Sequence, residues 1–506
     1  MLISNDAIDV APEADDQGRG ERSGMTEDGR TDSVTETGLP EASPAAPPWL
    51  PRLQGGGRSG GRPGRHGPAY LAIVEALAAD LAAAAITPGT RILPQREMAE
   101  RLGLSVGTVA KAYAEAARRG LIAGEVGRGT YVSATAAARP TVGGAAMVDM
   151  SLNTPPESGA GPLIAAAMAK VAASGEVATL LDYLPHAGVP AHRAAMAAWL
   201  AEDLGRPFPA AGIVLCNGAQ HGIALALMAA LAPGDTVLVE AVTYPGIAGI
   251  AARFGHRLHG VALDAEGLVP AALDEAFAAT GARALYCMPT LQTPTGAVMS
   301  AARREAIVAV LRRHDAWAIE DDVYAFLAPA AGPALATLAP ERVAYVGSLA
   351  KCLAPGLRVG VLAAPEALRG RVNTALRGTG WMASPLLTAT AAHLLRSGGV
   401  RAQAARKRIL AAERWRLAQN ILGRHARFPG TIGFHLWLPT TGAAAEIVTA
   451  AAAQGVVLAP PLVIPGAPAP EGLRLCLGAP ADLAEVRRGL GIVAAILDQG
   501  GGRALV

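Results

Sequence analysis

The chain has 506 residues, of which 51% are hydrophobic and 17% charged, and its formal net charge is +2. This length indicates more than one domain, the apolar fraction excludes a largely disordered chain, and the balanced charge excludes a uniformly basic nucleic-acid binder. The four cysteines lack metal-ligand spacing, which predicts free thiols and no metal site. The sequence shows no secretory signal and no apolar run of the roughly 18 residues that a membrane span needs. We therefore expect a cytoplasmic protein without a membrane partner.

The first 66 residues carry no apolar periodicity. Residues 1–50 contain eleven acidic residues and three arginines, whereas residues 51–66 contain four arginines and no acidic residue. We expect a disordered acidic tail that is followed by a basic Gly/Arg-rich arm. The arm is interpreted as a flexible linker, and contact with DNA phosphates is the alternative.

Residues 67–133 have the pattern of a small helical domain. Helices are expected at 70–84, at 95–102 and from Ser105 to Arg119, followed by two short strands around Gly127–Gly129. Gly103 suits a tight turn between two helices, and Ser105 is a natural N-cap for the third helix. This order predicts a winged helix-turn-helix whose third helix enters the major groove of DNA. A helical protein-interaction module is the alternative.

Three segments carry a family resemblance. Gly89-Thr-Arg-Ile-Leu-Pro-Gln-Arg, Leu102-Gly-Leu-Ser-Val-Gly-Thr-Val-Ala-Lys and Gly127-Arg-Gly-Thr-Tyr-Val resemble the GntR-type winged helix. The resemblance implies double-stranded DNA as a partner. It implies phosphate and base contacts from Arg91, Arg96, Ser105, Thr108, Lys111, Gly129 and Thr130. Val106 stands where many relatives have arginine, which implies altered base reading at that position.

Residues 134–147 are expected to be a linker, and residues 148–390 alternate between apolar strand-like runs and helical segments. This alternation is typical of an α/β domain with a mostly parallel sheet. Strands are expected at 213–216, 236–240, 284–288, 316–321, 343–347 and 359–363, and helices at 220–231 and 301–314. Residues 391–498 are expected to form a smaller α+β domain that begins with a long helix.

Several polar motifs follow the predicted strands. Gly218-Ala219-Gln220 opens a helix directly after a strand, and the free backbone N–H groups there suit a phosphate. Ser348-Leu-Ala-Lys351 follows another strand, and Arg358 comes shortly after it. The Ser348 hydroxyl and the Arg358 guanidinium would complete the phosphate cradle. A lysine at such a position can form a Schiff base with a carbonyl group.

Four further side chains fit the same site. Tyr244 can stack on an aromatic ring, and Asp321, at the end of a strand, can keep a pyridine nitrogen protonated. Tyr324 can hydrogen-bond the ring hydroxyl, and Arg474, at the start of the last strand, would pair with the α-carboxylate of an amino acid. Each residue alone could be a helix cap, a core aromatic or a surface ion pair. Their joint order indicates one site.

This order of motifs resembles the fold-type I aminotransferases, including their small carboxy-terminal domain. The resemblance implies pyridoxal 5'-phosphate as the cofactor and Lys351 as the residue that binds it. It also implies that Tyr183 reaches the phosphate of the partner subunit in a homodimer. Two positions depart from the family. Thr293 replaces the usual asparagine, so the contact of that amide with the ring hydroxyl is lost, and the Thr293 hydroxyl would partly replace it. Ala350 replaces a frequent serine. Both departures concern catalysis more than cofactor binding.

The two blocks in this order resemble the MocR group of transcription regulators over residues 67–497. The resemblance implies a DNA-binding regulator whose aminotransferase-like domain senses an amino acid or amine. Two alternatives stay open. The chain could be an active aminotransferase with a DNA-binding domain, in which Lys351, Asp321 and Tyr324 are catalytic. Alternatively, it could sense pyridoxal phosphate itself.

Overall fold

A computed structural model describes most of the chain. The described residues are 69–82, 86, 90–118, 121–125, 129–132, 141–142, 145–423, 425–426, 428 and 430–499. The expected acidic tail and basic arm, and the wing tip at 127–128, lie outside them. Within these ranges the chain forms two compact units: one contains residues 69–77 and the described residues between 86 and 132, and the other contains residues 78–82 and the described residues from 141 onward. None of the described helices has the length and apolar character of a membrane span.

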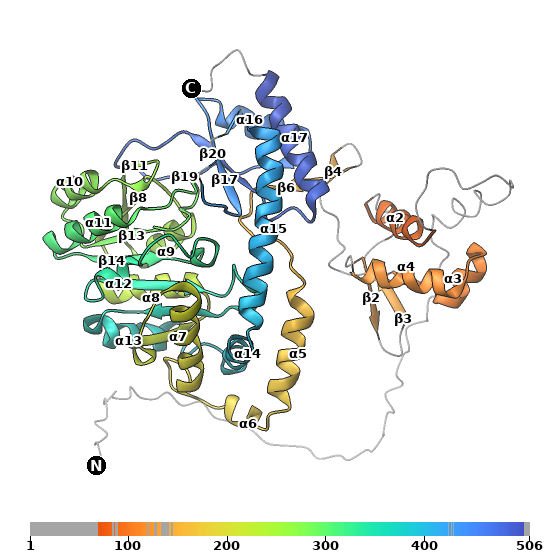
Figure 1. Cartoon of the computed structure of the whole chain (residues 1–506), viewed down its shortest axis with the longest axis horizontal. Helices are drawn as coiled ribbons and strands as arrows, with labels where there is room; N and C mark the ends of the chain where they lie inside the picture. The colour runs from red at the N-terminus through yellow and green to blue at the C-terminus, as the bar shows by residue number, and fades with distance from the viewer. Residues whose placement is uncertain are drawn as a thin grey trace, which may run out of the picture. The chain divides into compact units, whose positions relative to one another are not determined.

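The amino-terminal unit is a winged helix (Figure 1). Its described elements are α2 (Ala69–Ala82, with residues 69–77 in this unit), β1 (Arg91–Ile92), α3 (Gln95–Leu102), α4 (Val106–Arg118), β2 (Ile122–Glu125) and β3 (Gly129–Val132), with the strands ordered β1-β3-β2. Gly103 ends α3 with a φ of 63°, and Ser105 Oγ caps α4 by accepting a hydrogen bond from Thr108 N at 3.1 Å. The expected helix-turn-helix is thus confirmed, whereas β1 was not predicted because two residues give no periodicity.

The core of this unit contains a buried hydrogen bond between two of its elements. Tyr113 on α4 donates its hydroxyl to the main-chain oxygen of Leu93 at 2.6 Å. Tyr113→Phe leaves that oxygen buried without this donor, so we expect the unit to lose about 1–2 kcal/mol of stability. Native-state hydrogen exchange of the α4 amides measures this loss. Tyr70→Phe, at a partly exposed position of the same unit, is the matched control, and equal exchange in both variants would contradict the prediction.

The larger unit is built on a seven-stranded sheet. Its strands are β7 (Ile213–Cys216), β8 (Thr236–Glu240), β10 (Arg257–Val261), β13 (Ala284–Cys287), β14 (Trp317–Asp321), β15 (Val343–Ser348) and β16 (Gly360–Ala363). Their order is β10-β8-β13-β14-β15-β16-β7, and β16 alone runs in the direction opposite to the other six strands. The mostly parallel sheet is therefore confirmed. The edge strand β10 was not predicted, because Arg257 and His259 interrupt its apolar run.

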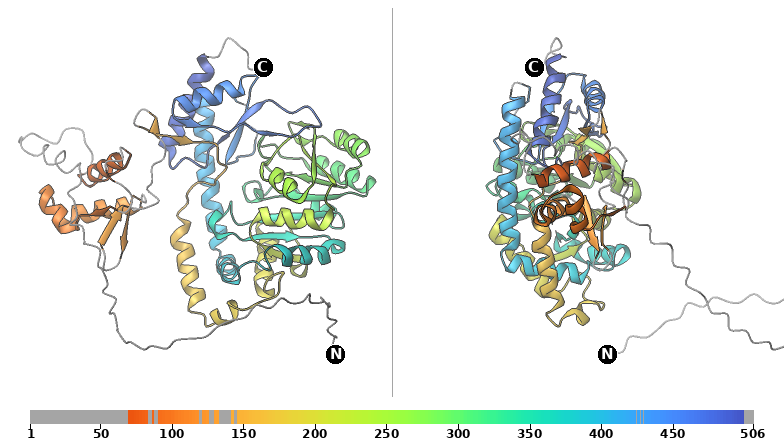
Figure 2. Two further views of the ribbon diagram at one scale, coloured as in Figure 1. Left: turned by 180° about the vertical axis from the view of Figure 1, so that it is seen from behind. Right: turned by 90° about the vertical axis from the view of Figure 1, so that its right-hand side faces the viewer.

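Helices cover this sheet (Figures 1 and 2). The helix α8 (Ala219–Ala230) packs against β14, β15 and β16, and α10 (Pro270–Thr280) packs against β8 and β10. The remaining helices of this region are α5 (Ala160–Ala172), α6 (Val177–Leu180), α7 (Pro190–Leu204), α9 (Gly246–Phe254), α11 (Ala301–Arg313), α12 (Leu335–Leu338) and α13 (Arg369–Thr379). The strands they cover are almost continuously apolar, as expected for a sheet that is buried on both faces.

A second, smaller layer follows in the chain. It contains the antiparallel pair β17 (His435–Pro439) and β20 (Gly472–Cys476), with α16 (Ala444–Ala453) and α17 (Leu483–Gln499). The strand β6 (Val148–Asp149) pairs with β18 (Val456–Val457), so the first described segment of the expected large domain joins this smaller layer.

Two helices lie where the sequence predicted one long helix. They are α14 (Pro385–Arg396) and α15 (Gly399–Leu422), separated at Gly398, whose φ is 76°. Figure 1 shows α15 running from α14 to α17, alongside both layers.

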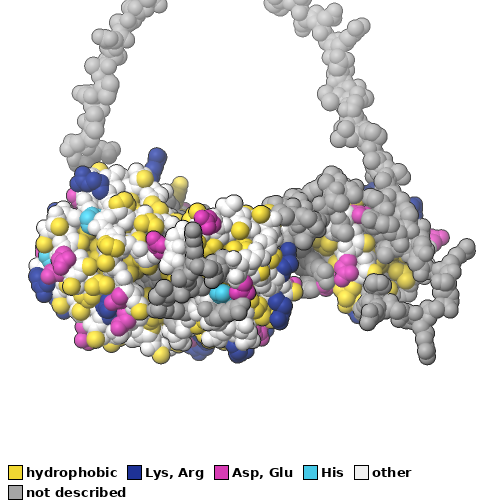
Figure 3. All heavy atoms as spheres, turned by 90° about the horizontal axis from the view of Figure 1, so that it is seen from above, with side chains coloured by type: hydrophobic (Ala, Val, Ile, Leu, Met, Phe, Trp, Pro, Cys, Tyr) yellow, Lys and Arg dark blue, Asp and Glu magenta, His cyan; other side chains and the backbone are white. Residues whose placement is uncertain are grey.

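On the face shown in Figure 3, Lys or Arg and Asp or Glu side chains are interspersed, in keeping with the small net charge.

Candidate functional site

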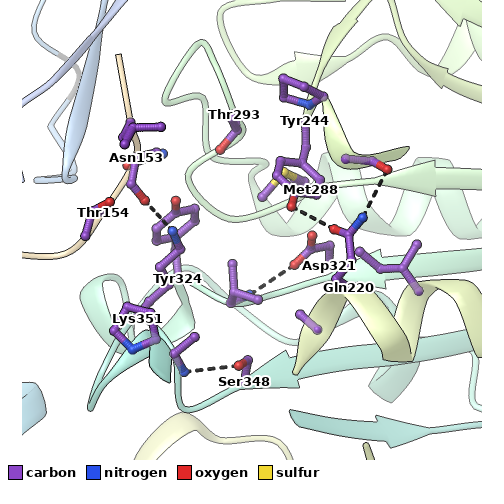
Figure 4. Close-up of a pocket in the computed structure, with 18 of the residues that line it drawn as sticks. Asn153, Thr154, Gln220, Tyr244, Met288, Thr293, Asp321, Tyr324, Ser348 and Lys351 are labelled. Carbon is purple, nitrogen blue, oxygen red and sulfur yellow. Dashed lines mark hydrogen bonds between the residues drawn. The ribbon is translucent and has the colours of Figure 1, made fainter. Parts of the chain in front are cut away.

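A cavity of about 600 Å³ lies at the carboxyl ends of the parallel strands in the larger unit (Figure 4). In α/β proteins, ligands bind at this edge of the sheet. The residues predicted from the sequence that line it are Ala219, Gln220, Tyr244, Thr293, Asp321, Tyr324, Ser348, Lys351, Arg358 and Arg474. The structure therefore brings these residues together from separate places in the chain.

One end of the cavity has the features of an anion site. Gly218 precedes α8 with a φ of 83°, and a Cβ atom placed on it would lie 2.5 Å from Nη2 of Arg358. Only glycine therefore lets the guanidinium approach this turn so closely. Arg358 Nη2 donates to Asn217 O at 3.0 Å, and Ser348 Oγ donates to Val359 O at 3.2 Å. A helix start, a guanidinium and a hydroxyl thus meet in one place.

Lys351 follows β15 and lies in a polar part of the cavity. Its Nζ donates to the main-chain oxygen of Asn153 and lies 5.6 Å from the centre of the Tyr324 ring. Burial lowers the pKa of Lys351 to about 8, although Cys476 and Asp321 act in the opposite direction. The amine is therefore much more readily deprotonated than that of an ordinary lysine.

This pKa predicts unusual reactivity at Lys351. Only the neutral amine attacks an electrophile, so modification by trinitrobenzenesulfonate should reach half its maximal rate near pH 8 instead of near 10.5. Mass spectrometry of the digested protein locates the label, and the exposed Lys170 serves as the reference within the same sample. A Lys351 that reacts only above pH 10 would refute the prediction.

Asp321 places a buried carboxylate beside the cavity. It ends β14, and the hydroxyl of Tyr286 donates to its Oδ2 at 2.9 Å. Burial raises the pKa of Asp321 to about 6, and the hydrogen bond from Tyr286 opposes this rise. A carboxylate of this kind can accept a hydrogen bond from a cationic ring N–H group. The sequence did not predict Tyr286, because it lies inside an apolar strand.

Two tyrosines complete the walls. The Tyr244 hydroxyl donates to Gln220 Oε1 at 2.7 Å, which joins the segment after β8 to the start of α8. Tyr324 is buried, which raises the pKa of its hydroxyl, and the nearby Thr293 side chain acts in the opposite direction. Thr293 therefore lines the cavity together with the phenol that was expected to bind a ring hydroxyl.

His435 on β17 is a site residue that the sequence did not predict. Its Nδ1 lies 3.0 Å from Asn153 Nδ2, and its Nε2 lies 3.1 Å from Gln292 O. Burial lowers the pKa of His435 to about 3, so the ring is neutral, with Nε2–H donating to Gln292. Asn153 and His435 are 282 residues apart, and no local sequence pattern announces such a contact.

Arg474 brings a cation from the smaller layer to the cavity. It lies on β20, and its Nη2 donates to Ser151 O at 2.5 Å. Tyr183 does not line this cavity; it is 80% exposed, and its ring lies 5.7 Å from that of Trp381.

The residues expected to contact DNA lie in the winged helix. Arg91 is on β1, Arg96 on α3, Thr108 and Lys111 on α4, and Gly129 and Thr130 on β3, while Ser105 caps α4. The Lys111 ammonium lies 4.8 Å from the centre of the Tyr70 ring. The opposite face of α4 is buried through Val109, Ala112 and Ala116, as expected.

Comparisons with known proteins agree with this organisation. Residues 145–492 match the family model "Aminotransferase class I and II", and residues 69–132 match "Bacterial regulatory proteins, gntR family". An uncharacterized HTH-type transcriptional regulator of Bacillus subtilis (strain 168) is 28% identical over 443 residues, which cover 85% of this chain and 95% of that protein. The probable rhizopine catabolism regulatory protein MocR of Rhizobium meliloti is 28% identical over 388 residues, covering 71% and 78%.

A solved structure is also similar. It is LysN, the α-aminoadipate aminotransferase of Thermus thermophilus, complexed with N-(5'-phosphopyridoxyl)-L-leucine. It has a TM-score of 0.61 and 26% identity, and the match covers 70% of this chain and 92% of that one.

The fold and the cavity define a protein with an aminotransferase-type domain, and the chain belongs to the class I and II aminotransferase family. It carries a gntR-family domain ahead of that domain, so the expected MocR-type organisation is confirmed.

Proposed function

We propose that this protein is a pyridoxal-phosphate-dependent, DNA-binding transcription regulator that senses an amino acid or amine. One observation carries the proposal: the same chain contains a GntR-type helix-turn-helix and a cavity where Lys351, Asp321, Arg358 and Arg474 converge. The regulators among its relatives, and the phosphopyridoxyl compound in the solved aminotransferase, support both halves.

The cavity residues fit this cofactor. The turn at Gly218, which a Cβ atom would fill, would hold the phosphate together with Arg358 and Ser348. Asp321 would accept the ring N–H, Tyr324 and Thr293 would face the ring hydroxyl, and Tyr244 would contact the ring. When bound, the cofactor supplies an electrophilic carbon that reacts with amines.

The remaining residues explain how a ligand could change the protein. Lys351 supplies an amine that loses its proton easily because its pKa is lowered, and Arg474 supplies a cation that can pair with the carboxylate of a ligand. Because Arg474 belongs to the smaller layer, a ligand carboxylate would connect that layer to the large sheet. A ligand regulates only if it binds one conformation better than another. Typical coupling of ~1–3 kcal/mol would change DNA affinity about 5–150-fold.

The proposal includes a cytoplasmic homodimer with shared sites. Three large apolar side chains are exposed near one another: Leu181, Tyr183 and Trp381. Leu181 and Tyr183 are close together in the chain, and the rings of Tyr183 and Trp381 are in contact. Such surface is typical of a protein interface. Tyr183 would then act on the partner's site.

Sequencing the DNA fragments that the purified protein retains, with and without pyridoxal phosphate and added amino acids, tests the function. We expect the protein to retain one DNA sequence and to gain visible absorbance after the cofactor is added. We also expect one of the added amino acids to change both the DNA retention and the absorbance. Release of a keto acid without any change in DNA binding would favour the aminotransferase alternative. A response to the cofactor alone would favour a sensor of pyridoxal phosphate. No retained sequence and no uptake of the cofactor would refute the proposal.

A further inference from the structure

The long helix α15 carries two buried cations that form no ion pair with any described residue. Lys407 is 2% exposed and Arg414 is 4% exposed, and their positions two helical turns apart place both on one face of the helix. No carboxylate of a described residue lies within 4.0 Å of either side chain. A buried charge without a counter-ion is costly unless hydrogen bonds compensate for it. The contacts of these two side chains therefore show what they hold.

Lys407 holds the turn that contains Lys351. Its Nζ donates to Leu353 O at 2.7 Å and to Lys351 O at 3.3 Å. The turn is closed by Leu353 N, which donates to Leu349 O at 2.8 Å. Within the described chain, no main-chain N–H donates to the oxygen of Lys351 or Leu353. The ammonium of Lys407 thus takes the place of the missing donors at the end of this turn.

Arg414 holds a different part of the main chain in the same manner. Its Nη1 donates to Leu477 O at 2.6 Å and to Pro480 O at 2.8 Å, in the segment after β20. The two side chains are alike in burial, in helix face and in the kind of contact. They differ in that only Lys407 touches the residue that carries the reactive amine.

We propose that Lys407 is a positioning residue for Lys351: its buried ammonium fixes the main-chain oxygen of Lys351 and so aims that side chain into the cavity. Geometry and charge act together in this arrangement. Besides burial, which has the largest effect, Arg474 and Lys407 lower the pKa of Lys351, while Cys476 and Asp321 raise it. The groups that face Lys407 itself are Cys352 and Glu157.

The test is the pH profile of Lys351 modification by trinitrobenzenesulfonate in the full-length protein without added cofactor, read by mass spectrometry. In Lys407→Met the loss of one nearby positive charge should move the midpoint upward by about one pH unit. Lys407→Arg keeps the charge and should restore the wild-type midpoint. Arg414→Met removes an equally buried cation that lies away from the turn, and it should leave the midpoint unchanged. If Lys407→Met does not fold, Lys407→Gln takes its place.

A wild-type midpoint in Lys407→Met, or an equal shift in Arg414→Met, would overturn the proposal. The second result would mean that loosening α15 anywhere disturbs the site. In protein loaded with pyridoxal phosphate, the pH midpoint of the visible absorbance should change in Lys407→Met and not in Arg414→Met. This absorbance measurement rests on the proposed function, whereas the labelling does not. Protein that takes up no cofactor therefore speaks against the proposed function and leaves the labelling to decide the role of Lys407.

Discussion

Lys351→Ala is expected to abolish the visible absorbance that the wild-type protein gains with pyridoxal phosphate. Lys351 is the only lysine among the residues that line the described cavity, so no other lining side chain offers an amine to the cofactor. The phosphate contacts at Gly218, Ser348 and Arg358 remain, so the variant should still bind the cofactor without a covalent link. Absorbance spectra and the mass of the borohydride-reduced protein measure the effect.

The exposed Lys170 gives the matched control. Lys170→Ala should keep the full absorbance, because its side chain lies on the exposed part of α5. Lys351→Ala should also keep its affinity for DNA in the absence of ligand, since α4, the helix expected to enter the major groove, belongs to the other compact unit. A reduced cofactor adduct at another lysine of Lys351→Ala would show that the assignment is wrong.

Arg206→Met is expected to cause the largest loss of stability in the larger unit. Arg206 Nε lies 3.0 Å from Asp322 Oδ2, and the two side chains are 2% and 0% exposed. Arg206 Nη1 also donates to Gly332 O at 3.0 Å. Removing the arginine leaves a buried carboxylate without its counter-ion, next to Asp321, which costs about 3–5 kcal/mol. The free energy of unfolding of the full chain in urea measures this loss. Hydrogen exchange of the β14 and β15 amides, measured separately, shows that the loss lies in the larger unit.

A double variant makes the test specific to the buried pair. Arg206→Met combined with Asp322→Leu removes both charges, and it should be less destabilised than Arg206→Met alone. Arg401→Met is the surface control, because Arg401 pairs with Asp203 at 2.5 Å but is largely exposed, and its loss should have little effect. Equal losses in the Arg206 and Arg401 variants would refute the prediction.

Much of the fold followed from local patterns. The strands β7 and β8 have the bounds that the sequence predicted, because continuous apolar runs between turns mark strands that are buried on both faces. The pattern failed where tertiary contacts decide. At the sheet edge, β10 tolerates Arg257, which is exposed there, and at Gly398 a left-handed glycine divides a helical run that looked continuous.

The candidate site shows the same division. Lys351, Asp321 and Ser348 could be found because each lies at or just after the end of a recognisable strand, and the carboxyl ends of parallel strands meet at one edge of the sheet. Asn153 and His435 could not be found, since their contact depends on a strand of the smaller layer meeting a segment far away in the chain. Lys407 gave no signal either, because a lysine in the middle of a long helix normally faces solvent.

The single antiparallel strand of the large sheet has a consequence for how the site opens. Because β16 turns back along β15, Ser348 lies directly opposite Gly360, and the eleven residues between them form one closed loop that carries both Lys351 and Arg358. Fraying of this one loop would release the amine and the guanidinium in the same event. A ligand bound by both Lys351 and Arg358 would, by mass action, stabilise the closed loop. Binding of that ligand would therefore first slow the hydrogen exchange of the loop's amides.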